Sequence, residues 1–296
     1  MQKEIYLLKT ITPLHIGAGQ GLGHVDLPVV REVHTNFPYI PGTSLKGALR
    51  NWEINQVAMT IGEKPSQVEE KLTKGEGELK DESMLRLAKI FGIAGEGAEE
   101  GRGVGAGKVL FSDGFILLFP VKSAKGIFSL TTCPYAINRF FEFVGLDQRI
   151  KEVQEGKVKV LDTKDHKNLI NGKLLLEEFI FEAEDSQELK GFVELLKGFL
   201  GEENIKRLVC VSDTDFTDFV SNYTEVQTHI KIDLDTGTVK EKALWTEEYV
   251  PAESVFVFGL TFLEDIEYSP PSTFHLGGDI TTGKGFVKVQ RLEVQR

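Results

Sequence analysis

Two glycine-rich segments at opposite ends of the chain constrain its fold more than any other feature. The first, HIGAGQGLGHVD at 15–26, follows a strand-like run at 3–11, and the second, GGDITTGKGF at 277–286, precedes a strand-like run at the C-terminus. Glycine adopts backbone conformations that other residues avoid and lets neighbouring groups approach closely, so both segments are expected to be loops. We hypothesise that the terminal strands are neighbours in one sheet, which would bring the two loops to one surface.

Helix-like and strand-like runs alternate irregularly along the rest of the chain. From apolar spacing and residue preferences, helices are expected at 45–59 (capped by Thr43 or Ser44), 82–92 (ending at Gly92), 134–144 and 186–200 (closed by Gly201). Strands are expected at 108–120 (one strand or a strand pair), 173–184 and 254–264. Residues 225–250 are expected to form a hairpin around the turn Asp235-Thr236-Gly237. Irregular alternation with hairpins favours an α+β fold with an antiparallel sheet over a doubly wound parallel one.

The composition indicates a soluble protein. Of the 296 residues, 41% are hydrophobic, which is enough for a sizeable core. The two cysteines, Cys133 and Cys210, do not make a disulfide framework and suggest a reducing compartment. The N-terminal run MQKEIYLLKTI is too polar for a secretory segment, and no run approaches about eighteen apolar residues. We expect a cytoplasmic protein that does not cross a membrane.

The charge is acidic overall but uneven along the chain. A net charge of -11 argues against a protein that coats nucleic acid indiscriminately, because neutralisation of phosphates supplies most non-specific affinity. Acidic residues dominate 63–100, whereas within 31–50 four residues that carry or can carry positive charge outnumber Glu32: Arg31, His34, Lys46 and Arg50. An acidic chain can still present a basic face.

Two side chains near the first glycine-rich segment are candidates for chemistry. Asp26 is either a turn or cap residue, or a metal ligand or proton acceptor at a phosphate. His15, at the end of the first strand, is either a packed, hydrogen-bonded histidine or a catalytic one. Local sequence leaves both choices open.

Other polar groups have simpler interpretations. The loop 277–286 either contacts a phosphate through backbone N–H groups and Lys284, or is a plain hairpin turn. Glu247 and Glu248 are most simply a solvated pair. The acidic residues of SDTDFTD (212–218) are explained by the first turn of a helix that Ser212 or Asp213 would cap.

Several separated motifs together resemble one known family. TPLHIGAGQGLGHVDLPVVRE, PGTSLKGALR, LLFPVKSAKGIFSLTTCPYAINRF, DTGTVKEKALWTEEYVPAES and GGDITTGKGFVKV are similar to the RAMP superfamily of CRISPR proteins. More narrowly, they resemble the multi-copy backbone subunit of the type III-B (Cmr) effector complex. The similarity extends over essentially the whole chain.

The resemblance implies a single RAMP domain over residues 1–296. Its core would be ferredoxin-like (RRM-like) with an antiparallel sheet and glycine-rich loops, a helical insertion at about 55–105 and a thumb-like hairpin at about 225–255. It also implies a subunit that stacks on copies of itself along a CRISPR RNA, in a helical filament with the other Cmr subunits. The thumb would interrupt pairing with complementary target RNA, which each subunit would cleave with a divalent metal, Mg²⁺ or Mn²⁺.

The resemblance also assigns residues to these roles. Asp26 matches the aspartate that the family needs for metal-dependent cleavage, and His15 matches a position near the active centre. The positions that the resemblance assigns to RNA binding are Arg31, Ser44, Lys46, Arg50, Gly277, Gly278, Thr281, Thr282, Gly283 and Lys284.

Three alternatives remain open at this point. The chain is an architectural RNA-binding subunit in which Asp26 is only a loop residue, the equivalent subunit of a type III-A (Csm) complex, or a guide-processing ribonuclease. The last of these would act alone and would use a histidine-centred acid–base pair.

Overall fold

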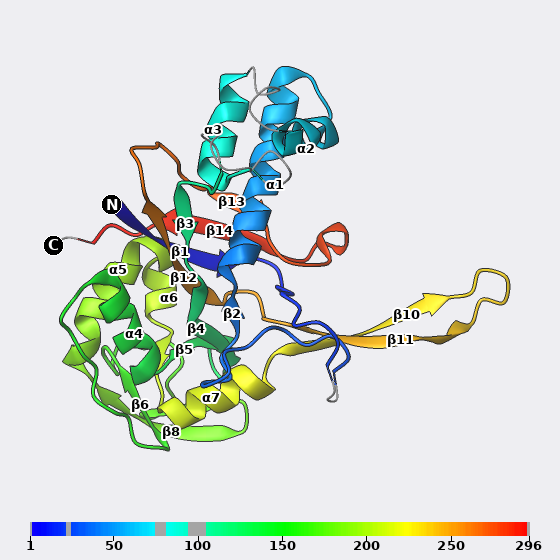
Figure 1. The fold of residues 1–296 in the computed structure, drawn as a ribbon. Helices are drawn as coiled ribbons and strands as arrows, with labels where there is room; N and C mark the ends of the chain where they lie inside the picture. The colour runs from blue at the N-terminus through cyan, green and yellow to red at the C-terminus, as the bar shows by residue number, and fades with distance from the viewer. Residues whose placement is uncertain (1, 22–24, 75–80, 94–104, 295–296) are drawn as a thin grey trace.

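The computed structural model describes residues 2–21, 25–74, 81–93 and 105–294. It shows a central sheet, a group of helices on each side of the sheet and a long two-stranded arm that leaves the body (Figure 1). His24 and the segment 94–104, which is part of the expected helical insertion, lie outside the described residues.

The terminal strands are neighbours in the sheet. β1 (Gln2–Thr10) pairs antiparallel with β14 (Phe286–Arg291) on one side and with β12 (Val255–Phe262) on the other. In this register Leu8 lies opposite both Val289 and Phe256. The hypothesis that the two ends of the chain meet in one sheet is confirmed.

The sheet contains twelve strands within the described residues. Their order is β13 (Thr273–His275), β14, β1, β12, β4 (Gly114–Lys122), β5 (Phe128–Thr132), β9 (Leu208–Cys210), β6 (Lys157–Val160), β8 (Phe179–Asp185) and β7 (Lys173–Leu176), with β2 (Tyr39–Ile40) on β4 and β3 (Val109–Phe111) on β12. Most pairs are antiparallel, and β5–β9 and β6–β8 are parallel. The single strand expected at 173–184 is wrong: it is the hairpin β7–β8, because the chain turns at Glu177, whose φ is 47°.

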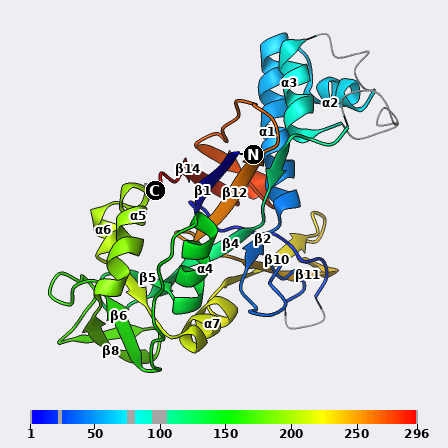
Figure 2. The same cartoon turned by 60° about the vertical axis from the view of Figure 1, so that its left-hand side comes forward.

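The helices form two groups that pack on opposite faces of the sheet. One group contains α1 (Gly42–Ile61), α2 (Pro65–Lys74) and α3 (Glu82–Phe91), and the other contains α4 (Pro134–Val144), η3 (Gln187–Leu189), α5 (Lys190–Leu200) and α6 (Glu202–Ile205) (Figure 2). α7 (Asp213–Asn222) leads to the arm (Figure 1). The helices expected to end at Gly92 and Gly201 do so, and Ser212 caps α7 as expected.

Alternation along β1 builds two separate cores. Tyr6 and Leu8 belong to the cluster that includes the apolar side of α1, whereas Ile5 and Leu7 belong to the cluster with α4 and α5. Because successive side chains of a strand point to opposite faces, one strand serves both layers. The α+β fold with a mostly antiparallel sheet is confirmed.

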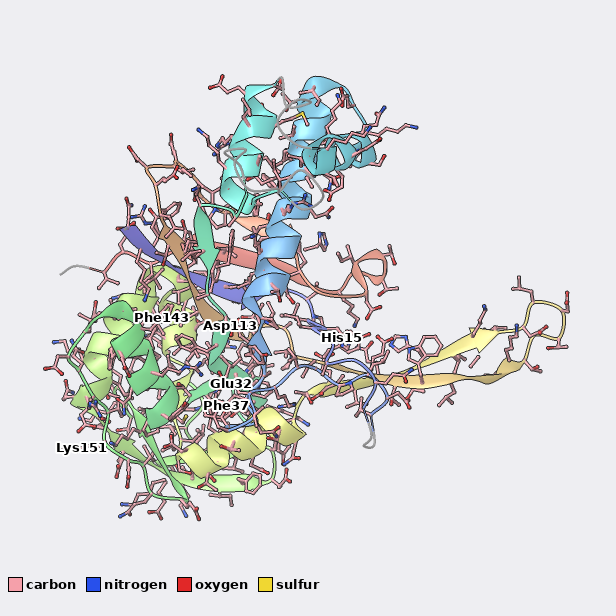
Figure 3. All side chains as sticks on the ribbon, viewed as in Figure 1. His15, Glu32, Phe37, Asp113, Phe143 and Lys151 are labelled. Carbon is pink, nitrogen blue, oxygen red and sulfur yellow. The ribbon has the colours of Figure 1, made fainter. Side chains whose placement is uncertain are left out.

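α1 begins one residue earlier than its expected caps. Its N-cap is Pro41, whose side chain has no hydrogen-bond acceptor. The prediction that Thr43 or Ser44 caps the helix is therefore wrong. Instead, the carboxylate of Asp113 accepts a hydrogen bond of 2.7 Å from the Gly42 N–H (Figure 3). A distant strand connection thus supplies the acceptor that local sequence lacks.

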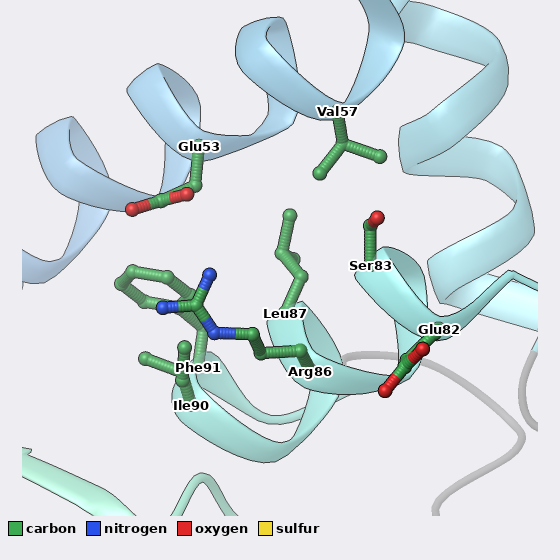
Figure 4. Close-up of a pocket in the computed structure, with 8 residues that line it drawn as sticks. All are labelled: Glu53, Val57, Glu82, Ser83, Arg86, Leu87, Ile90 and Phe91. Carbon is green, nitrogen blue, oxygen red and sulfur yellow. The ribbon is translucent and has the colours of Figure 1, made fainter. Parts of the chain in front are cut away.

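A small cavity of about 240 Å³ separates α1 from α3 (Figure 4). Its wall includes Glu53 of α1 and Arg86 of α3 beside the apolar Val57, Leu87 and Phe91. Burial raises the pKa of the Glu53 carboxyl, although the charge of Arg86 opposes this shift. This cavity lies within the helical group.

The arm consists of β10 (Glu225–Ile232) and β11 (Val239–Tyr249), which form a separate two-stranded sheet among the described residues. It lies in the range expected for the thumb-like hairpin. Exposed apolar side chains share one of its faces: Val226, Ile230, Ile232, Val239 and Leu244. No helix among the described residues is long and apolar enough to cross a membrane.

Candidate functional site

His15 lies where the two glycine-rich segments meet, at the base of the arm (Figure 3). Its carbonyl accepts a hydrogen bond of 2.9 Å from the Gly278 N–H. A Cβ on Gly277 would lie 2.2 Å from that carbonyl oxygen, and a Cβ on Gly17 would lie 2.8 Å from the ring Nε2. These glycines therefore allow both segments to pack closely around the histidine.

The His15 ring is fixed by the arm. Its Nδ1 lies 2.7 Å from the backbone oxygen of Glu248, and its ring centroid is 5.6 Å from that of Tyr249. Because a carbonyl can only accept, Nδ1 carries the hydrogen. In the neutral ring, Nε2 is then the acceptor nitrogen.

Two carboxyl groups share the hydroxyl of Tyr249. Its oxygen lies 2.6 Å from Glu247 Oε2 and 3.1 Å from Asp279 Oδ2. Burial opposes ionisation of Glu247, but hydrogen bonds from Tyr249 and from the Trp245 indole outweigh it and lower its pKa to about 2. Burial and the neighbouring Glu247 raise the pKa of Asp279. Glu247 is therefore the ionised member of the pair, and Asp279 is the one that protonates first.

Two basic side chains complete this cluster. His229 of β10 stacks on Trp245 with 5.5 Å between ring centroids, and its Nε2 lies 3.2 Å from the Tyr249 hydroxyl. The Lys284 ammonium lies 4.6 Å from the centroid of the Tyr249 ring. The C-terminal loop, the first loop and the arm thus bring titratable groups to one place.

Asp26 occupies the outer edge of β11. Its Oδ2 accepts hydrogen bonds from the Thr246 N–H (2.8 Å) and hydroxyl (2.9 Å), and these bonds lower the pKa of its carboxyl. Asp26 is exposed and lines a depression of about 440 Å³ together with Gly21, Leu27 and Trp245. Trp245 therefore contacts both the Asp26 depression and the Glu247 cluster.

The chain provides few ligands for a metal. In the described ranges, no group of three or more His, Cys, Asp or Glu side chains is placed to hold a metal ion. Mg²⁺ commonly binds through one or two carboxylates, with waters and substrate phosphates filling its other positions. An ionised, exposed Asp26 fits that limited role and does not fit a site built from protein alone.

A second candidate surface, a mainly apolar groove with two basic side chains, lies along the first turns of α1. Lys46 and Arg50 line an open groove of about 760 Å³ with Thr43, Gly47 and the segment 105–107. The Arg50 guanidinium is held by Glu69 of α2 at 2.8 Å. Ser44 is half-buried on the same helix. This groove is distinct from the Asp26 depression.

Arg31 lies away from the α1 groove, at the base of the arm. Its guanidinium contacts Glu248 at 2.5 Å and donates hydrogen bonds to the carbonyls of Asn36 (2.9 Å) and Val220 (2.8 Å). Its side chain is 15% exposed, so these contacts occupy most of its donor surface. In the C-terminal loop, by contrast, Thr281, Thr282 and Gly283 are exposed.

Comparison with known proteins establishes the family. The model of the RAMP superfamily matches residues 7–288. The chain belongs to the RAMP superfamily. It is 34% identical to the CRISPR system Cmr endoribonuclease Cmr4 of Pyrococcus furiosus, over 99% of this chain and 97% of that protein. The crystal structure of oligomeric Cmr4 from Pyrococcus furiosus covers all of both chains with a TM-score of 0.65 at 25% identity.

A second relative matches only part of the chain. The chain is 38% identical to the CRISPR system Cms endoribonuclease Csm3 of Streptococcus thermophilus, over 83 residues that cover 27% of this chain and 38% of that protein. The likeness to Cmr4 is the one that extends along the whole chain. The predicted RAMP membership and the resemblance to the Cmr subunit are confirmed.

The burial of two glutamates in this cluster, at the base of the arm of the RAMP chain, was not predicted from the sequence. The solvated pair expected at Glu247 and Glu248 is wrong, since each residue is only 6% exposed. Alternation along β11 places Glu247 and Tyr249 on one face, and cross-strand pairing sets Trp245 opposite His229. The alternation along β11 could have shown that Glu247 and Tyr249 share a face of the hairpin. It does not show which end of the hairpin packs against the rest of the protein.

Proposed function

We propose that this RAMP protein is the backbone subunit of a type III-B CRISPR ribonucleoprotein, which binds CRISPR RNA and cleaves complementary target RNA. The observation that carries the proposal is the exposed, ionised Asp26 held against the base of a projecting arm. The endoribonuclease name of the Pyrococcus furiosus relative supports it. The working place of such a particle is the cytoplasm.

The groove along α1 is the proposed site for the guide strand. Lys46 and Arg50 offer positive charge there. In the exposed loop at 281–283, the Thr281 hydroxyl is a further donor, whereas the N–H groups of Thr282 and Gly283 already bond to carbonyls within the loop. Basic side chains and hydroxyls bind phosphates and carry no sequence information. The guide is therefore held by its backbone, and specificity comes from base pairing with the target.

The arm is the proposed element that interrupts pairing between guide and target. Its exposed face carries apolar side chains, among them the cross-strand pair Ile230 and Leu244, 48% and 62% exposed. Apolar side chains placed between bases unstack them, and an unstacked nucleotide leaves its backbone free to turn. Copies of the chain stacked along one guide, with the other Cmr subunits at the ends, would repeat this interruption at regular intervals.

Cleavage uses the nucleophile that RNA already carries. The 2′-hydroxyl gives its proton to solvent as its oxygen attacks the adjacent phosphorus. The bond from phosphorus to the 5′-oxygen breaks, and the 5′-oxygen takes up a proton from solvent. The products are a 2′,3′-cyclic phosphate and a 5′-hydroxyl. Asp26 would hold a divalent ion, Mg²⁺ or Mn²⁺, jointly with the target phosphate, and such an ion supplies stabilisation of the charge that develops on oxygen. His15 and Lys284 lie at the same base of the arm, where they orient or neutralise the phosphate.

Asp26→Asn in the assembled complex tests the assignment. We expect target cleavage to fall by about 100-fold or more, with guide and target binding unchanged, because the substitution removes one charge and keeps the shape. Asp185→Asn is the matched control, since Asp185 is an exposed aspartate at the end of β8, away from the arm, whose carboxylate also accepts a backbone hydrogen bond, from the Thr163 N–H. Undiminished cleavage by the Asp26 variant would make the chain an architectural subunit.

A further inference from the structure

A buried carboxylate joins the Asp26 loop to the arm. Glu248 is 6% exposed, and its Oε2 accepts a hydrogen bond of 2.9 Å from the Val29 N–H. Its Oε1 accepts from Arg31 at 2.5 Å and from the Thr224 hydroxyl at 2.7 Å. One side chain therefore binds the loop that carries Asp26 and both strands at the root of the arm.

The backbone around Glu248 forms a short ladder with the same loop. The Leu27 N–H donates to the Thr246 carbonyl at 3.0 Å, and the Glu248 N–H donates to the Leu27 carbonyl at 3.0 Å. The contact between Val29 and the Glu248 carboxylate continues this ladder by one more step. Asp26 lies at one end of this ladder, so its position relative to β11 depends on the register that the ladder fixes.

Arg31 makes the attachment rigid. Besides Glu248, it binds the carbonyl of Val220 on α7, which precedes the arm, and the carbonyl of Asn36 in its own loop. A buried carboxylate that is paired and hydrogen-bonded has little freedom, whereas removal of one partner leaves the other charge unpaired in the interior. The network resists rotation of the arm against the loop.

We propose that Glu248, with Arg31 as its partner, is a positioning residue that sets Asp26 for cleavage of the target. The inference rests on the proposed function, because it assigns a task to residues that support the Asp26 site. It gives Arg31 a role in holding this loop in place of the backbone contact with RNA that the sequence suggested. Displacement of a reacting group by about 1 Å costs up to about 100-fold in rate.

The test compares Glu248→Gln with wild type in the full guide-loaded complex. We expect kcat for target cleavage to fall roughly tenfold to 100-fold, while KM and the target dissociation constant stay within about twofold. The shape of the pH–rate profile should not change, because Glu248 acts through the loop and not on the RNA. Glu253→Gln is the control, since Glu253 pairs with Lys9 at the surface, in a side chain that is 34% exposed.

A second variant and a hydrogen-exchange measurement test the positioning role even if the Glu248 variant assembles poorly. Thr224→Val removes one hydroxyl from the Glu248 carboxylate without burying a lone charge, and it should lower kcat in the same direction by a smaller factor. Hydrogen exchange in the purified chain should accelerate within the peptide 25–31 in the Glu248 and Thr224 variants and stay unchanged in the Glu253 variant. A rise in KM at constant kcat, or an unchanged exchange rate in both variants, overturns the positioning role.

Asp26→Asn, measured in parallel, separates this inference from the proposed function. If Asp26→Asn abolishes cleavage while Glu248→Gln and Thr224→Val leave kcat intact, only the positioning role falls. If Asp26→Asn cleaves like wild type, the proposed catalytic function falls and the positioning role falls with it.

Discussion

Thr246 supplies both hydrogen bonds that the Asp26 carboxylate accepts, one from its backbone N–H at 2.8 Å and one from its hydroxyl at 2.9 Å. In return, the Asp26 N–H donates to the same hydroxyl at 3.0 Å. These two residues are far apart in the sequence, and their contact fastens the first loop to the arm. Replacement of the Thr246 hydroxyl should therefore change the pKa of Asp26.

Thr246→Val should move the pH dependence of cleavage. The hydrogen bonds to Thr246 lower the pKa of Asp26, so loss of the hydroxyl raises this pKa towards its ordinary value. In the proposed mechanism the ionised form of Asp26 is the active one, so the acidic limb of the pH–rate profile should shift to higher pH. Thr236→Val at the arm tip is the control, and an identical acidic limb in both variants would contradict the expectation.

Glu69→Gln should strengthen guide binding. The Glu69 carboxylate lies 2.8–2.9 Å from Arg50, so it occupies a guanidinium that is proposed to bind the guide. An exposed ion pair is worth about 0.2–1 kcal/mol, which corresponds to a gain in guide affinity of at most about fivefold. The gain should shrink as salt rises, because salt weakens both contacts. Fluorescence anisotropy with a labelled guide measures it.

Glu70→Gln on the same helix is the matched control for Glu69. Glu70 pairs with Lys74 one turn away and not with Arg50, so its neutralisation changes the net charge equally. If both variants gain affinity to the same extent, the effect is one of net charge and the competition for Arg50 is refuted.

Local signals predicted a large part of the fold. Glycines fixed the ends of α3 and α5, and Ser212 fixed the start of α7, because caps depend on the few residues around them. The contact between the terminal strands was a hypothesis suggested by the two glycine-rich segments, and the pairing of β1 with β14 confirms it. The start of α1 did not follow, because its acceptor is Asp113, more than sixty residues away.

Candidate residues could be found from the sequence where they lie in the glycine-rich loop. They could not be found where their role depends on burial by distant segments. Asp26 and His15 were candidates because they lie in the glycine-rich segment, but the local sequence left their roles open and only the family resemblance assigned them to cleavage. The burial of Glu247 and Glu248 results from the packing of the first loop and the C-terminal loop on β11, which no local pattern reports. For the same reason, Arg31 was assigned to RNA although Glu248 engages it within the chain.

Gly277→Ala should destabilise the chain more than Gly283→Ala. Both glycines have a positive φ, +83° and +85°, so both substitutions bear the same backbone cost of about 1–2 kcal/mol. A Cβ on Gly277 would also meet the His15 carbonyl at 2.2 Å, whereas a Cβ on Gly283 has nothing within 4 Å. Urea unfolding should therefore show a larger loss for Gly277→Ala, by about 1 kcal/mol or more. Equal losses would contradict the close packing around His15.

Because His166 is buried, the free energy of unfolding of the chain should fall in mild acid. Burial lowers the pKa of His166 from its ordinary 6.5 to about 4, so the folded chain keeps this side chain neutral. Between these values the unfolded chain binds a proton that the folded chain does not. The free energy of unfolding therefore falls as pH decreases from 6.5 to 4, by up to about 3 kcal/mol in all.

His166→Gln should remove this component of the pH dependence. Between pH 7 and pH 5 the wild-type chain should lose about 2 kcal/mol more unfolding free energy than the variant, since glutamine has no proton to gain. His34→Gln is the control, because the His34 side chain is 66% exposed and its replacement should leave the difference between the two pH values intact. Urea titrations of the three proteins at both pH values measure it. A variant that loses as much stability as wild type would show that His166 is protonated in the folded chain.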